Sequence, residues 1–421
     1  MKTQPHTIYR AELLLIIICS LFPVVNPALA QVWSSNSVPG EDWCIVASSA
    51  DGKVLVAVSN PGPIYISTNS GAAWSQATNA PVGDWQTVAC SADGSKIIAA
   101  QGGGAGSLYS SIYTSPDTGV TWVSNNAPVL SWSTVASSAD GTKLVAADYN
   151  NHGIYTSTDS GTTWTPAINS PKGALYSIAS SADGSKLAAV AIKYSPNIYT
   201  STNFGMTWTT NNVPASPQGV QNGWGSIASS ADGSKLIAAG GGGIPGYIFL
   251  STNFGAAWSV TATNILPSHG FDEWICVASS ADGSKLAAVS QSTSPGEIIT
   301  STDSGTTWIT NPVPNLTWNA VALSADGANR IAAVGYPSYV GPIYSSRTTF
   351  APVLNLASRS NNLALSWIIP STNFVLQQNS DLTTTNWVTL TNAPALNLTD
   401  LQNQVMLSPT NSSGFYRLAS P

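Results

Sequence analysis

The dipeptide Asp-Gly recurs seven times along the 421-residue chain, at intervals of 42 to 50 residues. A repeat of this length is typical of a β-propeller, in which each unit forms one four-stranded blade around a central axis. The repeats therefore predict an all-β, seven-bladed propeller whose turns carry these aspartates: Asp51, Asp93, Asp140, Asp183, Asp232, Asp282 and Asp326.

Each repeat begins with an apolar segment before Asp-Gly, such as WCIVASS from Trp43 or WSTVASS from Trp132. We expect this segment to be strand A, the innermost strand of its blade. Asp-Gly then predicts a tight turn, because both of its residues can adopt positive φ angles. Strand B follows, and after a loop of variable length strand C reads IYIST, IYTST or IFLST.

A second motif, S-x-[DN]-x-G-x-x-W, connects strand C to the outermost strand D in six of the seven repeats. We expect its Asp or Asn to hydrogen-bond the backbone two residues on, and its glycine to supply the left-handed residue that reverses the chain. The tryptophan is expected to pack between neighbouring units. The six copies begin at Ser67, Ser115, Ser157, Ser201, Ser251 and Ser301.

The seventh repeat lacks this motif, because after Tyr344 the chain reads SSRTTF. Residues 31–39, QVWSSNSVP, are similar to D strands elsewhere in the chain, such as TWVSNNAPV. We therefore predict that the N-terminal strand completes blade seven and closes the ring. Residues 351–421 carry no repeat, but their alternating apolar segments predict a small C-terminal β-sandwich-like module after a propeller of residues 31–350.

Residues 1–30 have the pattern of a signal peptide. Lys2 and Arg10 precede the apolar run 13–22, and the small residues Ala28 and Ala30 stand at the expected cleavage site. We expect cleavage near Ala30 and export to the periplasm, cell surface or medium. The apolar run is shorter than the roughly 20 residues that cross a bilayer, so no transmembrane anchor is expected in the mature chain.

Composition argues against nucleic acid as a partner. The chain has 14 Lys and Arg against 20 Asp and Glu, a formal net charge of −6, and no basic cluster that could neutralise phosphates. Three cysteines follow the leader, Cys44, Cys90 and Cys276, so at least one thiol is unpaired. Each lies in or beside a repeated apolar strand, where a small buried side chain fits; the pairing state stays open.

The six S-x-[DN]-x-G-x-x-W motifs resemble those of the Asp-box, or bacterial neuraminidase repeat, superfamily. This superfamily includes sialidases, xyloglucan hydrolases, sortilin-type receptors and a photosystem II assembly factor, and the resemblance covers residues 31 to about 347. It implies the propeller fold and no particular activity. Sialidases of the superfamily hold their substrate with three arginines, and this propeller has only Arg330 and Arg347, which argues against sialidase activity.

In this topology the A–B and C–D turns share one face of the ring, here called the turn face. The B–C loops and the D–A connections share the opposite face, the loop face, where binding residues are expected. Its aromatic rings could stack on a sugar, and its carboxylates could accept hydrogen bonds; the alternative is a set of solvated loop residues. The candidates are Asp42, Asp84, Tyr109, Tyr149, His152, Tyr194, Tyr247, Asp272, Glu273 and Tyr336.

We expect an exported, monomeric, non-catalytic propeller that binds a polysaccharide or an extracellular protein at the loop face. The alternative is a carbohydrate-active enzyme, a hydrolase or lyase, which would need two carboxylates about 5–9.5 Å apart, for example from Glu41 and Asp42 or from Asp272 and Glu273. No cofactor is expected. A metal site is not expected either, because His152 and His269 belong to nearly opposite blades.

Overall fold

The computed structural model describes fourteen stretches of the chain, and all of the regular secondary structure in them is β-strand. Within these stretches no helix is long and apolar enough to cross a membrane. The described residues are 31–102, 110–150, 152–192, 197–214, 223–241, 246–261, 273–291, 296–335, 340–348, 353–359, 362–369, 374–380, 384–407 and 415–419.

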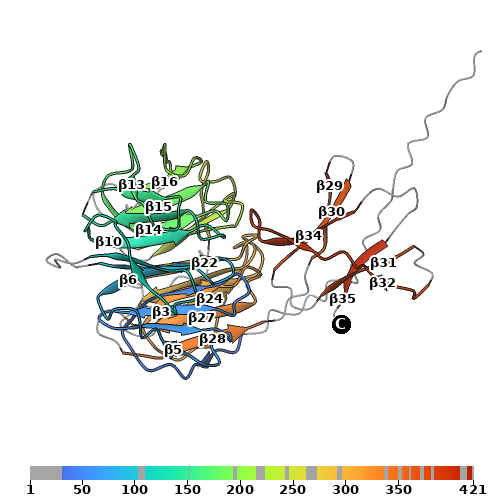
Figure 1. Cartoon of the computed structure of the whole chain (residues 1–421), viewed down its shortest axis with the longest axis horizontal. Helices are drawn as coiled ribbons and strands as arrows, with labels where there is room; N and C mark the ends of the chain where they lie inside the picture. Colours follow the sequence, from blue (N-terminus) through green and yellow to red (C-terminus); the bar gives the residue numbers. More distant parts are fainter. Residues whose placement is uncertain are drawn as a thin grey trace, which may run out of the picture.

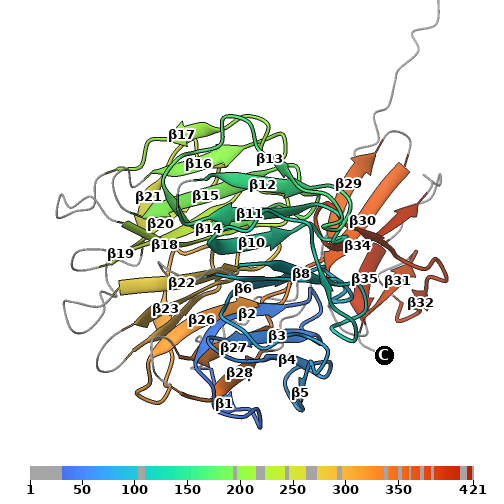
Figure 2. The ribbon, with the colours of Figure 1, turned by 60° about the vertical axis from the view of Figure 1, so that its left-hand side comes forward.

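Seven four-stranded antiparallel sheets form the blades of a propeller (Figures 1 and 2), as the repeats predict. The A strands are β2 (Trp43–Ser48), β6 (Trp85–Cys90), β10 (Trp132–Ser137), β14 (Ala174–Ser180), β18 (Gly223–Ser229), β22 (Glu273–Ser279) and β26 (Trp318–Leu323). The B strands are β3 (Leu55–Ser59), β7 (Ile97–Gln101), β11 (Leu144–Asp148), β15 (Leu187–Ile192), β19 (Leu236–Gly241), β23 (Leu286–Gln291) and β27 (Asn329–Val334).

The outer half of each blade consists of strands C and D. The C strands are β4 (Ile64–Ser67), β8 (Ile112–Ser115), β12 (Ile154–Ser157), β16 (Ile198–Ser201), β20 (Tyr247–Ser251), β24 (Ile298–Ser301) and β28 (Ile343–Arg347). The D strands are β5 (Ser75–Gln76), β9 (Val123–Ser124), β13 (Thr165–Pro166), β17 (Thr209–Asn211), β21 (Ser259–Thr261), β25 (Ile309–Thr310) and, for blade seven, β1 (Ser34–Ser35).

The core lies between neighbouring blades. In six blades a buried tryptophan stands at or next to the start of strand A, and in five of them it makes an edge-to-face contact with an aromatic ring of strand C, as Trp43 does with Tyr65. The tryptophans of the C–D turns pack into the same inter-blade clusters, as expected from the sequence; Trp122, for example, packs against residues of blades one and two. The ring is therefore held together by apolar contacts at every interface.

The Asp-Gly turns differ in one respect from the expected geometry. Only the glycines have positive φ angles, for example 68° at Gly52, so the expectation of two such residues was wrong. The turn has four residues, because the Gly52 N–H donates to the Ser49 carbonyl at 3.0 Å. The Asp51 carboxylate accepts bonds from the Ser49 hydroxyl and the Lys53 N–H, which fixes the turn without a left-handed aspartate.

The C–D turns also depart from expectation. In the first of them, Asn69 Oδ1 accepts the N–H of Ala73, four residues on rather than two. The Ser67 hydroxyl donates to Asn69 and accepts the Gly71 N–H at 2.9 Å. Gly71 does have a positive φ, but so does Ser70, at 59°. Two consecutive left-handed residues therefore reverse the chain, and the side-chain bonds compensate for the strain at the first of them.

A closed ring of backbone hydrogen bonds links all seven blades. The alanine before each Asp-Gly donates its N–H to the carbonyl of the corresponding alanine in the next blade, over 2.7–2.8 Å. The last bond, from Ala325 to Ala50, joins blade seven to blade one. This alanine ring consists of Ala50, Ala92, Ala139, Ala182, Ala231, Ala281 and Ala325.

The N-terminal strand closes blade seven as predicted. Strand β1 pairs antiparallel with β28, so that Ser34 lies opposite Ser345 (Figure 2). Trp33 is only 8% exposed and belongs to the cluster shared by blades six, seven and one. Chain segments about 300 residues apart thus form one sheet.

The C-terminal residues form two further sheets on the side of the turn face (Figure 1). One contains β29 (Asn355–Arg359), β30 (Asn362–Ile368), β33 (Ala395–Asn397) and β34 (Gln402–Leu407); the other contains β31 (Val375–Asn379), β32 (Val388–Thr389) and β35 (Phe415–Ala419). Side chains of both sheets share one core, as in a sandwich. This module contacts the propeller through the side chains of Ile368, Ile369 and Leu401, which pack against the alanine ring.

Candidate functional site

On the loop face of blades one, two and three, a hydrogen bond joins the B–C loop to the connection that leads into strand A. In blade one, Asn60 N–H donates to the Asp42 carbonyl at 3.0 Å, and in blade two Gly102 N–H donates to the Asp84 carbonyl at 3.0 Å. In blade three, Tyr149 N–H donates to the Ser131 carbonyl at 2.8 Å. These bonds hold the expected binding residues on one rim.

Acidic residues occupy the same position in three blades. Asp42 and Asp84 each precede the tryptophan of strand A, and Glu273 precedes Trp274 in the same way. Asp42 is half-buried and Asp84 is exposed, whereas only the backbone of Glu273 is described. The described carboxylates of blades one and two, Asp42 and Asp84, therefore give the rim an acidic side and can accept hydrogen bonds from hydroxyl or ammonium groups.

On blade three, a buried aspartate orients His152. Asp148, 0% exposed at the end of β11, accepts the His152 Nδ1–H at 2.7 Å and the His152 backbone N–H at 3.0 Å on the same oxygen. Since a carboxylate only accepts hydrogen bonds, Nδ1 carries the proton and Nε2 is left for a ligand. The sequence reasoning missed Asp148, although its i, i+4 spacing from a histidine at a strand end was a usable signal.

The part of the rim near blade three carries groups of a different kind from the acidic side. Tyr149 is 39% exposed, and Lys172 is exposed in the connection from blade three to blade four. A Cβ added to Gly153, next to His152, would lie 3.5 Å from the Lys172 ammonium nitrogen. The described rim is therefore acidic at blades one and two, and carries an imidazole, a phenol and an ammonium group near blade three.

The remaining candidates are not part of this arrangement. Tyr247 begins strand β20, is 5% exposed and packs in the cluster that contains Trp224 and Phe249, so its expected place on the loop surface is corrected. It is buried because it pairs with Gly240 inside the sheet. Four candidates lie outside the described residues: Tyr109, Tyr194, Asp272 and Tyr336.

The three described cysteines are free thiols. Burial raises the pKa of Cys44 to about 12, with a further increase from the Asp42 carboxylate. Burial also raises the pKa of Cys90 to about 12. Thiols of this kind stay protonated at neutral pH and are poor nucleophiles. In the described part of the chain, no group of three or more His, Cys, Asp or Glu side chains is placed to hold a metal.

The turn aspartates serve the fold. The backbone N–H of Thr163, followed by the hydroxyls of Thr163 and Ser157, lowers the pKa of Asp159 to about 2. Burial acts to raise the pKa of Asp93, but hydrogen bonds from Ser91 and Ser95 outweigh it and leave the pKa below its ordinary value. These carboxyls are ionised at neutral pH and cannot act as general acids.

No protein-family model matches this chain, and no curated protein matches it. Solved structures do. A GH74 xyloglucanase from Xanthomonas campestris is 16% identical with a TM-score of 0.58, over 80% of this chain and 59% of that one. A GH74 enzyme from Niastella koreensis is 13% identical with a TM-score of 0.58, over 86% of this chain and 60% of that one. YCF48 bound to a D1 peptide is 14% identical with a TM-score of 0.56, over 76% of this chain and 97% of that one.

The shared feature is the propeller. At these identities the likeness shows the fold alone, and the chain spans only about 60% of the length of the GH74 proteins. The two arginines of this propeller also lie away from the loop face: Arg330 is 2% exposed near the start of β27, and Arg347 ends β28. Both are therefore at the turn-face ends of their strands.

Proposed function

We propose that this protein is an exported binding propeller of the Asp-box superfamily, which takes a polysaccharide or an extracellular protein at its loop face without catalysis. One observation carries this proposal. Ile368, Ile369 and Leu401 of the C-terminal module cover the alanine ring, and Leu401 lines the channel at that end. Because this end of the ring is covered, a ligand that binds near the axis of the propeller would approach from the loop face.

The groups on that face support this class of ligand. Carboxylates at Asp42 and Asp84 can accept hydrogen bonds from sugar hydroxyls or from the ammonium groups of a peptide. Tyr149 offers a ring for stacking, and His152 is held in a fixed orientation by Asp148. A propeller of this fold, YCF48, is known with a D1 peptide bound, which supports a protein ligand.

The organisation that goes with this proposal has three parts. Residues 1–30 are a signal peptide removed near Ala30, residues 31–350 are the binding propeller, and residues 351–421 are a module that caps the turn face. The mature protein is proposed to act as a monomer outside the cytoplasm. Mass spectrometry of the secreted chain tests the cleavage site directly.

The proposal is tested with the purified mature chain on polysaccharide and peptide arrays, scored for both retention and released product. Retention without product, reduced by Tyr149→Ala and by Asp84→Asn, is expected. Lys53→Ala is the matched control, because Lys53 is exposed on the opposite turn face and its ion pair with Asp51 lies at the surface. If Lys53→Ala weakens retention as much as the loop-face variants, the binding face has been assigned wrongly.

A carbohydrate-active enzyme is the second candidate, favoured by the fold likeness to two GH74 proteins and by the Asp148–His152 pair. An imidazole whose Nδ1–H is held by a buried carboxylate is suited to act as a general base through Nε2. Release of soluble sugars from a polysaccharide, lost in His152→Gln, would establish this candidate and contradict the first.

A further inference from the structure

Two positions meet on the turn face at six of the seven interfaces between blades; the interface between blades six and seven lacks the second, because blade seven has no C–D turn motif. The first, the C-end residue, precedes the last serine of strand C, which ends the strand in blades one to six and is Ser346 in blade seven. The second, the turn residue, precedes the glycine of the C–D turn in the next blade. A Cβ added to Gly161 would lie 3.1 Å from the C-end residue Thr114 of the preceding blade, and one added to Gly255 would lie 3.2 Å from Thr200. Together these positions determine how well the interface is filled.

At four interfaces one of the two positions holds a large apolar side chain. Ile66 and Leu250 are large C-end residues, and both reach the turn glycine of the following blade. At the interfaces between blades three and four and between blades four and five, the C-end residue is threonine, and a phenylalanine turn residue fills the space. The Lys143 ammonium lies 5.8 Å from the Phe204 ring, and Lys186 lies 5.5 Å from Phe254.

Two interfaces have small residues at both positions, and both are hollow. Between blades two and three the residues are Thr114 and Ser160, and a cavity of about 370 Å³ lies there. Between blades seven and one they are Ser345 and Ser70, and the cavity is about 220 Å³. Both hollow interfaces therefore lack the large side chain that is found at the other four of these six.

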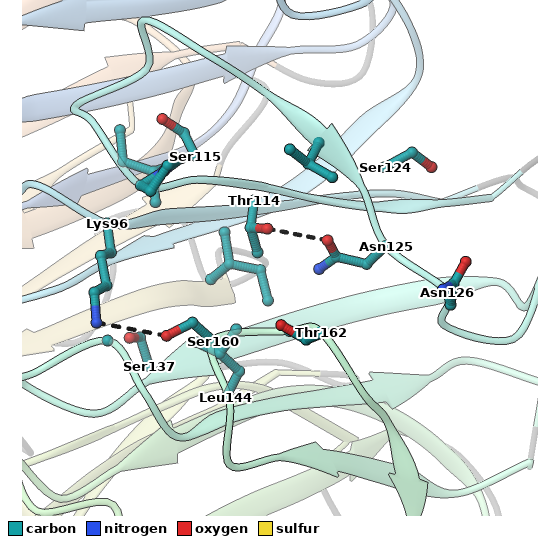
Figure 3. Close-up of a pocket in the computed structure, with 16 residues that line it drawn as sticks. Lys96, Thr114, Ser115, Ser124, Asn125, Asn126, Ser137, Leu144, Ser160 and Thr162 are labelled. Atoms are coloured by element: carbon teal, nitrogen blue, oxygen red, sulfur yellow. Dashed lines mark hydrogen bonds between the residues drawn. The ribbon is translucent and has the colours of Figure 1, made fainter.

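The larger cavity is apolar inside and polar at its edge, and Figure 3 shows residues that line it. Ile97, Ile98 and Leu144 line it and are 1–3% exposed, whereas Ser124 and Asn126 at its edge are exposed to solvent. An apolar interior with a polar entrance suits the burial of an uncharged ring.

Lys96 occupies the position in its blade that corresponds to Lys143 and Lys186, the lysines that lie over the two phenylalanine rings. Its ammonium group donates to the Asp140 carbonyl at 2.9 Å, as Lys143 does to Asp183 at 2.8 Å, and it lies 3.5 Å from the Ser160 hydroxyl (Figure 3). The backbone also matches, because φ is 57° at Ser160 and 53° at Phe204. The smaller cavity has Asn329 at the position of the lysine, and the cationic residues that line it are instead Arg330 and Arg347.

We propose that the cavity between blades two and three is a binding site for one uncharged aromatic ring, held beneath the Lys96 ammonium as Phe204 is held beneath Lys143. The ring comes from solvent, either as a small phenol or as the side chain of a peptide. This site lies on the turn face and does not depend on the ligand proposed for the loop face.

Methyl NMR of the chain tests the site with two probes, p-cresol and N-acetylphenylalanine amide. Saturable shifts of the Ile97, Ile98 and Leu144 methyls are expected with p-cresol, unchanged in Ser304→Ala at another interface and weaker by about tenfold or more in Ser160→Phe. Shifts with the amide as well identify a peptide side chain as the source; shifts with p-cresol alone identify a small molecule. The site is refuted if neither probe binds, or if Ser160→Phe binds as well as the wild type.

Thermal melting gives a second test that needs no ligand. Ser160→Phe should raise the melting temperature by about 2 °C or more, because the new ring fills the cavity. The matched control is Ser304→Phe, which should lower it, since Leu250 already fills that interface. If Ser160→Phe lowers the melting temperature as much as Ser304→Phe does, the cavity does not accept an aromatic ring and the proposal fails.

Discussion

Replacement of Trp33 by alanine tests how this propeller is closed. Trp33 and Trp258 occupy equivalent D-strand positions in blades seven and five, both are 8% exposed, and neither indole N–H has an acceptor among the described residues. Truncation of a buried tryptophan costs about 3–5 kcal/mol. The two variants therefore remove equivalent buried indoles, one from the inter-blade cluster that contains Trp43 and one from the cluster that contains Trp224.

The attachment determines the expected difference. Trp258 lies within a continuous blade, so Trp258→Ala should bear the full cost and lower the melting temperature by about 6–10 °C, at about 2 °C per kcal/mol. Trp33 lies in the first described segment of the chain, before strand β2, and ordering such a segment costs about 1–2 kcal/mol per residue. Without the indole, residues 31–38 should detach from blade seven. The loss of folding free energy in Trp33→Ala is then limited to the free energy with which this segment was bound, so its melting temperature should fall less than that of Trp258→Ala.

Hydrogen exchange distinguishes detachment from opening of the ring. In Trp33→Ala, we expect the amides of residues 31–38 to lose protection while those of Ala50 and Ala325 keep it. The inner interface is independently held by the Ala325–Ala50 bond at 2.8 Å and by the Trp43 indole N–H, which donates to the Gly341 carbonyl at 2.9 Å. Loss of protection at Ala50 and Ala325 would refute this reasoning, because it would mean that closure of the ring depends on β1.

Three further predictions follow from single contacts. Asp159→Asn should lower the melting temperature at pH 7 slightly and reduce its fall between pH 4 and pH 2. The lowered pKa of Asp159 means that the stabilisation by its carboxylate is present above the unfolded pKa of about 4 and is lost towards pH 2. An equal fall in the variant and the wild type would contradict this. Trp43→Phe should cost about 0.5–1.5 kcal/mol more than Trp132→Phe in denaturant unfolding, because of these two indoles only that of Trp43 has an acceptor among the described residues; equal costs would contradict it. Leu401→Asp should release the C-terminal module from the alanine ring and increase the radius of gyration measured by X-ray scattering, with little change in the melting temperature of the propeller; an unchanged radius would show that other contacts hold the module.

The repeat architecture could be predicted because its signals are local. Asp-Gly and the S-x-[DN]-x-G-x-x-W motif specify turns through bonds within a few residues, such as that from the Ser67 hydroxyl to Asn69. Counting these turns predicts seven blades, and the similarity of residues 31–39 to the D strands predicts the closing strand. The details of the dihedral angles could not be predicted in this way, because Ser70 adopts a positive φ only under the constraint of the surrounding bonds.

The candidate site was predicted less completely. Asp42, Asp84, Tyr149 and His152 do lie on the loop face, since their strand ends place them there. Tyr247 does not, because whether a residue beside a loop is the last of the loop or the first of the strand depends on sheet pairing. Asp148 was missed because its contact with His152 follows from the fold of one short loop.

By itself, the sequence determined the number of blades, the order of strands within each blade and the chemistry of the turns, because these depend on hydrogen bonds between residues close in the chain. Only the tertiary structure decided which residues meet across blades. The alanine ring, the covering of that ring by Leu401 and the hollow between Thr114 and Ser160 all join residues more than 40 positions apart. Such contacts depend on how the blades pack around the axis, and no local pattern specifies that packing.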